Sequence, residues 1–301
     1  MCKKTGGSKV QRNGMLTRRE VLCGLGAAAL ASTLPTSRAS TSKDTGMIDV
    51  EGGRVEYSVR GRGPSVYMIP SFGRGCEDFD MLSGTLVEHG YRVVCAQPRG
   101  AGGSTSEKPE LTLTDMANDA AAVLKAVGGA PAVLVGHDFG QRITRTLATQ
   151  RPELVTSLVM FACGGKIKMA PEVGRVGQLC FELSLPWYVR KAAVRYAFFA
   201  PGNDPTPWKG GWYPEAAKLQ RGGIADPVSG YWAAGGTVKV LVVQGLQDVS
   251  AVPENARLFK ADFPHRVQLV EIDHAAHALL PEQPRQTAEA VLKFLHENRR
   301  T

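Results

Sequence analysis

The chain of 301 residues is 43% apolar and 21% charged, which is typical of a globular protein with a substantial core and excludes a mainly disordered one. Its net charge of +8 is concentrated at the N-terminus, because residues 1–39 hold seven Lys or Arg and one acidic residue. Residues 40–301 carry a net charge of only +2, so the charge gives no support for nucleic acid as a partner.

The N-terminal segment 1–39 has the layout of an export signal. A basic region ends at Arg18 and Arg19, an apolar stretch runs over about 21–34, and a small-x-small cleavage pattern follows at 37–39. The apolar stretch is too short to span a bilayer comfortably. The arginine pair resembles a twin-arginine signal, so we expect a periplasmic or secreted protein that meets a membrane only through this signal. The alternative is a basic, disordered N-terminus with an amphipathic helix.

Four of the six cysteines lie beyond the leader, namely Cys76, Cys95, Cys163 and Cys180. Their spacing is not that of metal ligands, so we expect no metal site. Cys95 and Cys163 fall at apparent strand positions and are predicted to be small buried hydrophobic residues. Because a twin-arginine substrate folds in a reducing compartment, we expect no obligatory disulfide.

Short apolar runs alternate with helical patterns along most of the chain. Strands are predicted twice within 48–60, where Gly52-Gly53 joins them, and then at 66–69, 91–95, 132–135, 154–161, 238–244 and 267–272. Helices are predicted at 113–127, with Thr114 and Asp115 as capping residues, and at 140–150 and 285–297. Strands that are apolar on both faces and alternate with helices predict a parallel sheet covered on both sides.

The middle stretch 164–235 breaks this rhythm, since it contains aromatic residues, Pro and Gly without a strand–helix alternation. We therefore predict an α/β core formed by 40–163 and 236–301, interrupted by a cap insertion at 164–235. Its aromatic residues would cover a dry pocket with few polar groups, which suits a small apolar substrate.

A nucleophile elbow is predicted where the strand at 132–135 runs into Gly136-His137-Asp138-Phe139-Gly140 and then into a helix. The layout is G-x-nucleophile-x-G with Asp138 in the nucleophile's place, on a strained turn whose following helix stabilises negative charge. The alternative is that Asp138 only caps the helix. Two further residues favour catalysis, because Asp248 and His277 each follow a predicted strand and complete the order nucleophile, acid, base.

From about residue 48 to 298 the chain resembles the α/β-hydrolase superfamily. The elbow resembles that of the branch with an Asp nucleophile, which includes epoxide hydrolases and haloalkane dehalogenases. The segment 277–284, His-Ala-Leu-Leu-Pro-Glu-Gln-Pro, is similar to the family's His loop and selects His277 over His274 as the base. The resemblance implies a mostly parallel sheet with helices on both faces and an inserted helical cap.

The segment 69–73, Ile-Pro-Ser-Phe-Gly, occupies the place of the family's H-G-x-P loop. Pro70, Ser71 and Gly73 stand where the family has His, Gly and Pro. The oxyanion hole needs only backbone N–H groups, and the resemblance assigns these to Phe72 and Phe139.

The predicted chemistry follows from the aspartate and needs neither a metal nor an organic cofactor. An ionised carboxylate attacks an sp³ carbon without a base and forms an ester, which water then hydrolyses with His277 as base and Asp248 as its partner. Phe72 and Phe139 lack the polar side chains that hold a departing halide in haloalkane dehalogenases. Arg142 matches one of the two arginines of fluoroacetate dehalogenases.

Hydrolysis of an epoxide to a diol is therefore the predicted reaction, although the alternatives remain open. An opening epoxide needs a proton donor, and the insertion offers the candidates Tyr188, Tyr213 and Tyr231, besides Tyr196. The alternatives are a haloalkane or haloacid dehalogenase, an esterase or lactonase whose nucleophile has changed to Asp, and a ligand-binding protein without turnover.

Overall fold

The computed structural model describes residues 43–225, 232–233 and 235–298. The predicted export signal at 1–39 and the candidate donor Tyr231 lie outside the described residues. Within the described ranges, no helix has the length and apolar character needed to cross a membrane.

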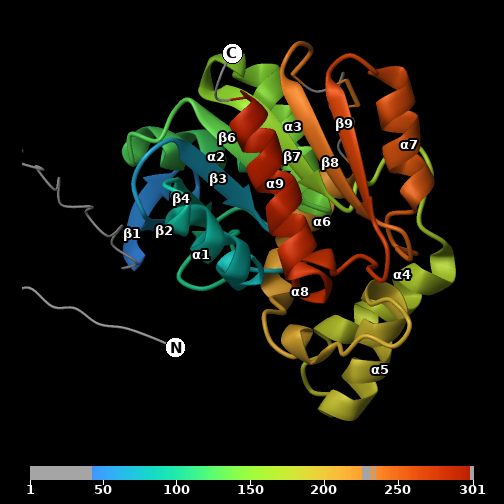
Figure 1. Ribbon diagram of the computed structural model, residues 1–301. Coiled ribbons are helices and arrows are strands. Elements are labelled where there is room, and N and C mark those ends of the chain that lie inside the picture. The colour runs from blue at the N-terminus through green and yellow to red at the C-terminus, as the bar shows by residue number, and fades with distance from the viewer. Residues whose placement is uncertain (1–42, 226–231, 234, 299–301) are drawn as a thin grey trace, which may run out of the picture. The chain divides into compact units, whose positions relative to one another are not determined.

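The core of the protein is one mixed, mostly parallel sheet (Figure 1). Its strands are β1 (Lys43–Val50), β2 (Gly53–Arg60), β3 (Ser65–Ile69), β4 (Arg92–Ala96), β5 (Thr105–Ser106), β6 (Ala132–His137), β7 (Val155–Phe161), β8 (Lys239–Gly245) and β9 (Val267–Ile272). The spatial order is β1-β2-β4-β3-β6-β7-β8-β9, and β5 pairs with β2. β2 is antiparallel to its neighbours β1, β4 and β5, whereas the strands from β4 to β9 along this order are parallel. The predicted parallel sheet and the hairpin within 48–60 are confirmed.

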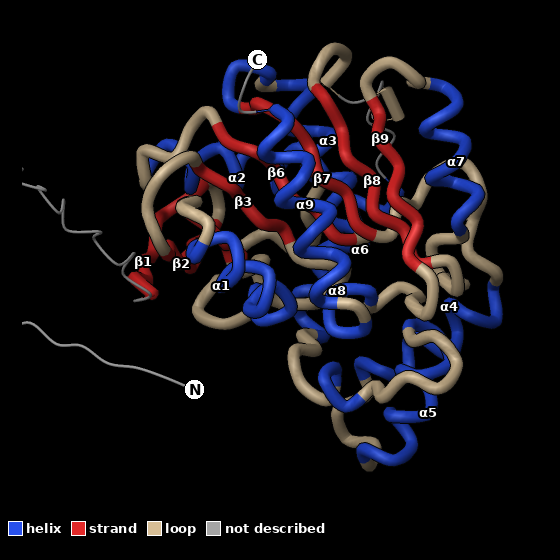
Figure 2. Tube along the Cα trace, in the orientation of Figure 1, coloured by secondary structure: helices blue, strands red, loops and turns tan. Residues whose placement is uncertain are grey.

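Helices cover both faces of the sheet (Figure 2). They are α1 (Asp80–Glu88), α2 (Leu113–Ala126), α3 (Phe139–Gln150), α4 (Pro171–Gln178), α5 (Trp187–Phe198), α6 (Pro214–Ala225), α7 (Pro253–Asp262), α8 (Leu279–Glu282) and α9 (Pro284–Asn298). α2, α3 and α7 share one buried apolar cluster with the sheet, and α1, α8 and α9 share another. Because apolar side chains are buried on both faces, the strands consist of continuous apolar runs.

The predicted helix at 113–127 is confirmed as α2, but its expected cap at Thr114 is wrong. The residue that caps α2 is Thr112, whose side chain accepts the N–H of Asp115 while the Asp115 carboxylate accepts the N–H of Thr112. This capping box satisfies two N–H groups that lack acceptors within the helix.

Between β7 and β8 the described residues form the helices α4, α5 and α6, and α4 and α5 lie beyond one end of the sheet (Figure 1). This segment is joined to the core through Arg74, which follows β3. Its buried guanidinium forms an ion pair with Asp78 and lies 4.4 Å and 4.5 Å from the ring centroids of Trp208 and Trp212. A desolvated cation between two indole rings contributes more than a surface ion pair, so this contact fixes the insertion to the core.

The structure corrects the expectation that no disulfide forms, because Cys76 and Cys95 are bonded to each other. The 3₁₀ turn Cys76–Phe79 brings Cys76 beside β4, where the two Cα atoms lie 5.9 Å apart. Cys95 and Cys163 are buried as predicted, and Cys163 and Cys180 are free thiols.

Candidate active site

Asp138 occupies a sharp turn between β6 and α3. Its backbone angles are φ 47° and ψ −110°, a left-handed conformation that a non-glycine residue rarely adopts. The neighbouring glycines are required by close packing. A Cβ at Gly136 would lie 2.6 Å from the Gln141 nitrogen, and one at Gly140 would overlap the carbonyl oxygen of Ile69. Asp138 is therefore held in a strained turn, which is a hallmark of sites where geometry serves function.

The structure brings Asp138, Asp248 and His277 together. His277 Nδ1 lies 3.0 Å from Asp248 Oδ2, and His277 Nε2 lies 3.7 Å from Asp138 Oδ2. Asp248 in turn accepts the N–H groups of Ser250 and Ala251 on Oδ1, each at 2.8 Å. The imidazole is thus oriented by a buried carboxylate and has its second nitrogen directed at Asp138, the candidate nucleophile.

His274, the other histidine of this loop, has a side chain that is 82% exposed, and its imidazole pairs with the neighbouring Asp273. His277 lies beside Asp138 and Asp248, whereas His274 is directed to the surface.

The charges of the three groups are strongly coupled. Burial alone would lower the pKa of His277, but the charges of Asp248 and Asp138 outweigh it and raise that pKa to about 10. Burial would likewise raise the pKa of Asp138, but the charge of His277 holds it below its ordinary value. At neutral pH the site therefore contains an imidazolium between two carboxylates.

The imidazole of His137 lies beside that of His277 and is neutral. Burial lowers its pKa to about 4, and its Nε2–H donates to the backbone oxygen of His277 at 2.9 Å. It supports the position of the base without adding charge.

The two residues predicted to form the oxyanion hole lie side by side, with ring centroids 5.7 Å apart. The N–H of Phe139 is the first of α3, and such groups have no acceptor within the helix. Phe72 belongs to the loop after β3, which is held by Gly73. The Gly73 N–H donates to Gln220 Oε1 at 2.7 Å, and its oxygen accepts the N–H of Tyr213 at 2.9 Å. Both of these partners come from the segment between β7 and β8, Tyr213 directly before α6 and Gln220 within it.

Ser71 is the residue that sequence reasoning missed. Its hydroxyl donates to Asp138 Oδ2 at 2.9 Å, and the residue is buried, with 4% exposure. One indication of this role was present in the sequence: Ser71 stands where the family's H-G-x-P loop has Gly.

The candidate proton donors of the insertion are not gathered around Asp138 in the described residues. The Tyr213 hydroxyl donates to Glu77 Oε1 at 2.9 Å, and burial together with the Glu77 charge raises its pKa to about 12. The side chains of Tyr188 and Tyr196 are 76% and 52% exposed. Arg142 is directed toward α6, where it donates to the oxygen of Ile224 at 3.3 Å.

Besides His137, two aromatic rings of the segment between β7 and β8 lie against His277. Phe198 and Trp208 have centroids 5.4 Å and 6.5 Å from that of His277. The rings of Phe72 and Phe181 lie nearly perpendicular to each other, with centroids 5.9 Å apart. Aromatic side chains thus lie close to His277 and to the loop that contains Phe72.

The C-terminal end of α5 connects the two loops that carry the acid and the base. Ser250 Oγ donates to the oxygen of Ala197 at 2.7 Å, and the N–H of Ala278 donates to the oxygen of Phe198 at 2.8 Å. These bonds satisfy carbonyl groups that a helix end leaves without partners. The position of the insertion and the geometry of the Asp248–His277 pair are thereby linked.

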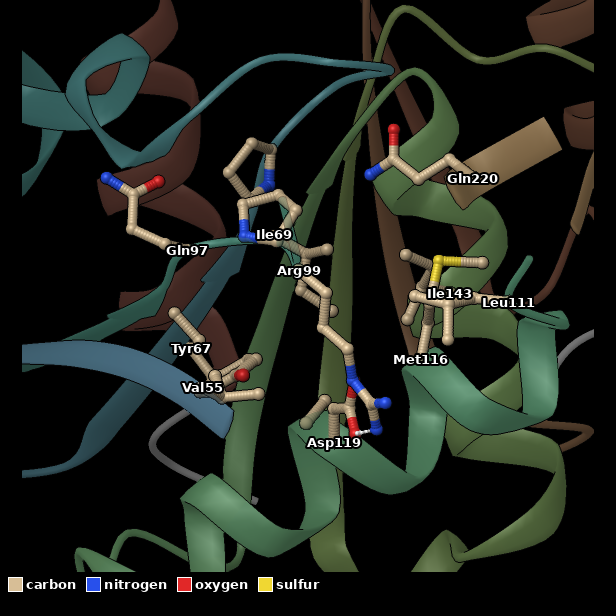
Figure 3. A pocket seen from close by; sticks show the side chains of 14 residues that line it. Val55, Tyr67, Ile69, Gln97, Arg99, Leu111, Met116, Asp119, Ile143 and Gln220 are labelled. Atoms are coloured by element: carbon tan, nitrogen blue, oxygen red, sulfur yellow. Dashed lines mark hydrogen bonds and ion pairs between the residues drawn. The ribbon is translucent and has the colours of Figure 1, made fainter. Parts of the chain in front are cut away.

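A small cavity of about 40 Å³ lies between the sheet and α2 (Figure 3). Ile69, Pro70 and Gln220 line it on the side of the oxyanion loop, and the Arg99–Asp119 ion pair lines it on the other. Asp138 is not among its lining residues, so this cavity is separate from the triad. Among the described residues, no group of three or more His, Cys, Asp or Glu is placed to hold a metal ion.

Comparison with known proteins identifies the family whose fold this architecture shares. Residues 64–176 match the family described as alpha/beta hydrolase fold. A thermophilic esterase from Thermogutta terrifontis superposes with a TM-score of 0.70 at 18% identity, covering 85% of this chain and 99% of the esterase. The chain therefore has the α/β-hydrolase fold.

Curated relatives match at low identity. Fluoroacetate dehalogenase from Burkholderia sp is 27% identical over 164 residues, which cover 53% of this chain and 53% of that enzyme. The match thus spans about half the length of this relative. A 2-(acetamidomethylene)succinate hydrolase from Mesorhizobium japonicum is 27% identical over 277 residues, covering 82% of this chain and 94% of the relative.

Proposed function

We propose that this chain, which has the α/β-hydrolase fold, is a hydrolase that acts through an ester formed on Asp138. The observation that carries the proposal is the strained elbow that directs the Asp138 carboxylate at a histidine 3.7 Å away, itself held by Asp248. An aspartate that only capped α3 would accept an N–H of the first turn, and Asp138 makes no such side-chain bond.

The reaction has two steps. In the first, one oxygen of Asp138 forms a bond to a substrate carbon, and the bond from that carbon to its leaving atom breaks with its electron pair. Esterification removes the negative charge of Asp138, so the pKa of His277 falls and its Nε2 can release its proton to the departing atom or to solvent. In the second step His277 takes a proton from water, which adds to the ester carbonyl. The N–H groups of Phe72 and Phe139 stabilise the oxyanion until the alcohol departs.

An epoxide is the proposed substrate class. The support is the environment of the nucleophile, where Phe72 and Phe139 provide no side-chain donor for a halide and the rings of Phe181 and Phe198 are apolar. The alkoxide formed on opening needs a proton, for which Tyr188, Tyr213 and Tyr231 remain the candidate donors. Tyr213 lies against the oxyanion loop through its N–H bond to Gly73, but its hydroxyl would have to leave Glu77 to reach a substrate.

Two other activities are supported by specific observations. The similarity to fluoroacetate dehalogenase favours a dehalogenase, and the superposition on an esterase favours ester or lactone hydrolysis. A protein that binds ligands without turnover would retain the fold but not form the ester.

The test uses the His277→Gln variant, in which the ester should form but not hydrolyse. Styrene oxide, 1-chlorobutane, fluoroacetate and 4-nitrophenyl acetate are each incubated with it, and the peptide containing Asp138 is examined by mass spectrometry. An adduct with styrene oxide that is absent from the Asp138→Ala variant supports the proposal. If only a halogenated compound forms an adduct, the substrate class is halogenated compounds and not epoxides. Turnover of only the nitrophenyl ester, without an alkyl adduct, would refute the mechanism.

We also propose that the protein is exported, on the basis of the Arg18-Arg19 leader. The Cys76–Cys95 disulfide is compatible with this route where the bond forms after the folded protein has reached an oxidising compartment. Changing both arginines to Lys should leave the precursor in the cytoplasm, as measured by cell fractionation. Unchanged export would point to another route.

A further inference from the structure

The hydroxyl of Ser71 makes a hydrogen bond to one particular oxygen of the nucleophile. Ser71 Oγ donates to Asp138 Oδ2 at 2.9 Å from a position that is 4% exposed. Ser71 directly precedes Phe72, so its hydroxyl lies on the same loop as the predicted oxyanion N–H. A glycine here would keep the backbone and lose the hydroxyl, so the donor is a feature of the side chain alone.

The effect of this bond depends on which oxygen attacks. A hydrogen bond to a charged oxygen stabilises that oxygen and makes it a poorer nucleophile. If Oδ2 attacked, Ser71 would stabilise the reactant and lose its acceptor on ester formation, which slows the reaction. If Oδ1 attacks, Oδ2 becomes the carbonyl oxygen of the ester, and the bond from Ser71 persists through the whole cycle.

We propose that Ser71 is a further catalytic residue, whose hydroxyl is a third donor of the oxyanion hole and commits Oδ2 to the oxyanion and Oδ1 to the attack. This inference rests on the proposed ester mechanism and specifies the role of each oxygen within it.

The charge on Oδ2 explains why the donor accelerates the second step. Oδ2 shares one negative charge with Oδ1 in the carboxylate, is formally neutral in the ester, and carries a full charge when water adds to the carbonyl. The bond from Ser71 is therefore strongest in the tetrahedral intermediate, and a donor that is already in place requires no rearrangement. It also supplies a donor in a loop where Gly73 replaces the proline of the family's motif.

The electrons and protons balance with Ser71 as a hydrogen-bond donor only. A lone pair of Oδ1 forms the bond to the substrate carbon, and the leaving atom departs with the electron pair of the broken bond. Water then adds to the carboxyl carbon after losing a proton to His277, and the electron pair of the C=O bond moves to Oδ2. When that pair returns, the bond between the carboxyl carbon and Oδ1 breaks, and Oδ1 leaves in the product with the proton from His277. The second proton of the water, left on the new carboxyl oxygen, then passes to His277 and restores the carboxylate and the imidazolium. The Ser71 proton stays on Ser71 throughout.

The first experiment separates the two steps in Ser71→Ala, with Ser71→Thr as the variant that keeps the hydroxyl. Ser83→Ala is the matched control, since it removes a buried hydroxyl on α1 whose partner is Met68. Removing an oxyanion donor typically slows a reaction by about 10²–10³-fold. We expect that loss in ester hydrolysis for Ser71→Ala, so that the Asp138 adduct accumulates with His277 intact. Adduct formation in the His277→Gln background should change little, and Ser71→Thr should restore hydrolysis.

The second experiment follows the oxygens and does not depend on rates. After many turnovers in ¹⁸O-water, wild-type Asp138 should contain one heavy oxygen, because Oδ1 leaves in each product while Oδ2 is retained. Two heavy oxygens in the wild type would overturn the assignment of Oδ1 and Oδ2. Ser71→Ala should allow the carboxylate to rotate and so acquire both.

The remaining outcomes also decide the question. Slower adduct formation with unchanged hydrolysis in Ser71→Ala would refute the oxyanion role, and so would equal loss of both steps together with a lowered melting temperature. If His277→Gln forms an adduct while Ser71→Ala hydrolyses its ester at the wild-type rate, only this inference fails. If no adduct forms on Asp138 in His277→Gln, the proposed function fails and this inference fails with it.

Discussion

Replacing Asp248 by Asn should stop the second step of the reaction and leave the first. The backbone N–H groups of Ser250 and Ala251 both donate to Asp248 Oδ1, so the Asn carbonyl must take that position. The amide NH₂ then faces His277 Nδ1, which can only accept from it. The imidazole proton is forced to Nε2, and the nitrogen directed at Asp138 can no longer act as a base.

The expected loss follows from this change of tautomer. A comparable exchange in a serine-protease triad lowers kcat about 10⁴-fold, which corresponds to roughly 5.5 kcal/mol of transition-state stabilisation. Because an ionised carboxylate attacks without a base, adduct formation on Asp138 should be much less affected. The Asp248→Asn enzyme should therefore accumulate the ester.

The assay is rapid quenching followed by mass spectrometry of the Asp138 peptide, with steady-state turnover measured in parallel. Asp262→Asn is the control, since that carboxylate is on α7, where it pairs with Lys166. Turnover of Asp248→Asn within tenfold of wild type would show that the acid lies elsewhere. Loss of turnover without any adduct would show that Asp248 is needed for the attack itself and would refute the reasoning.

Two further predictions concern stability, and a third concerns the turn that contains Asp138. Because the pKa of His277 is raised from 6.5 to about 10, its contribution to stability is complete below pH 6.5 and is lost as the pH rises toward 10. The difference in melting temperature between wild type and His277→Gln should shrink over that range, and a constant difference would contradict the coupling. Replacing Cys76 and Cys95 together by Ser should lower the free energy of unfolding by about 3 kcal/mol, since the bond closes a loop with a sequence separation of 19; equal urea midpoints with and without reductant in the wild type would contradict this. Gly140→Ala should abolish turnover, because the added Cβ would overlap a backbone oxygen of β3. Gly84→Ala is the control and should preserve turnover and stability, since a Cβ there meets open space. Full activity of Gly140→Ala would show that the elbow tolerates displacement.

The elements that were predicted correctly have strong local signals. β6 is a short apolar run, and the glycines on either side of Asp138 mark the sharp turn before α3. α1 and α7 were not predicted, although α7 begins with Pro253 directly after a buried loop. Gly84 and the mixed composition of α1 hide its apolar face, which becomes visible only where Leu82 and Leu86 meet α9.

Contacts between segments that are distant in the chain could not be predicted from the sequence. The Cys76–Cys95 bond depends on where the 3₁₀ turn after β3 lies relative to β4. The bond from Ser71 to Asp138 joins residues 67 positions apart and required coordinates to be seen. The predicted cap at Thr114 was wrong by two residues because Thr112 has the same chemistry and allows the reciprocal bonds with Asp115.

The two hydrogen bonds of Gly73 have a consequence for how this enzyme can change its substrate. Gln220 of α6 and Tyr213, directly before it, hold the loop that contains Phe72, so the proposed oxyanion hole is supported by the segment between β7 and β8. Exchange of this segment for that of a related protein would remove those supports. New specificity should therefore arise through single changes among the aromatic side chains, such as Phe181 beside Phe72, while the segment as a whole is inherited with the core.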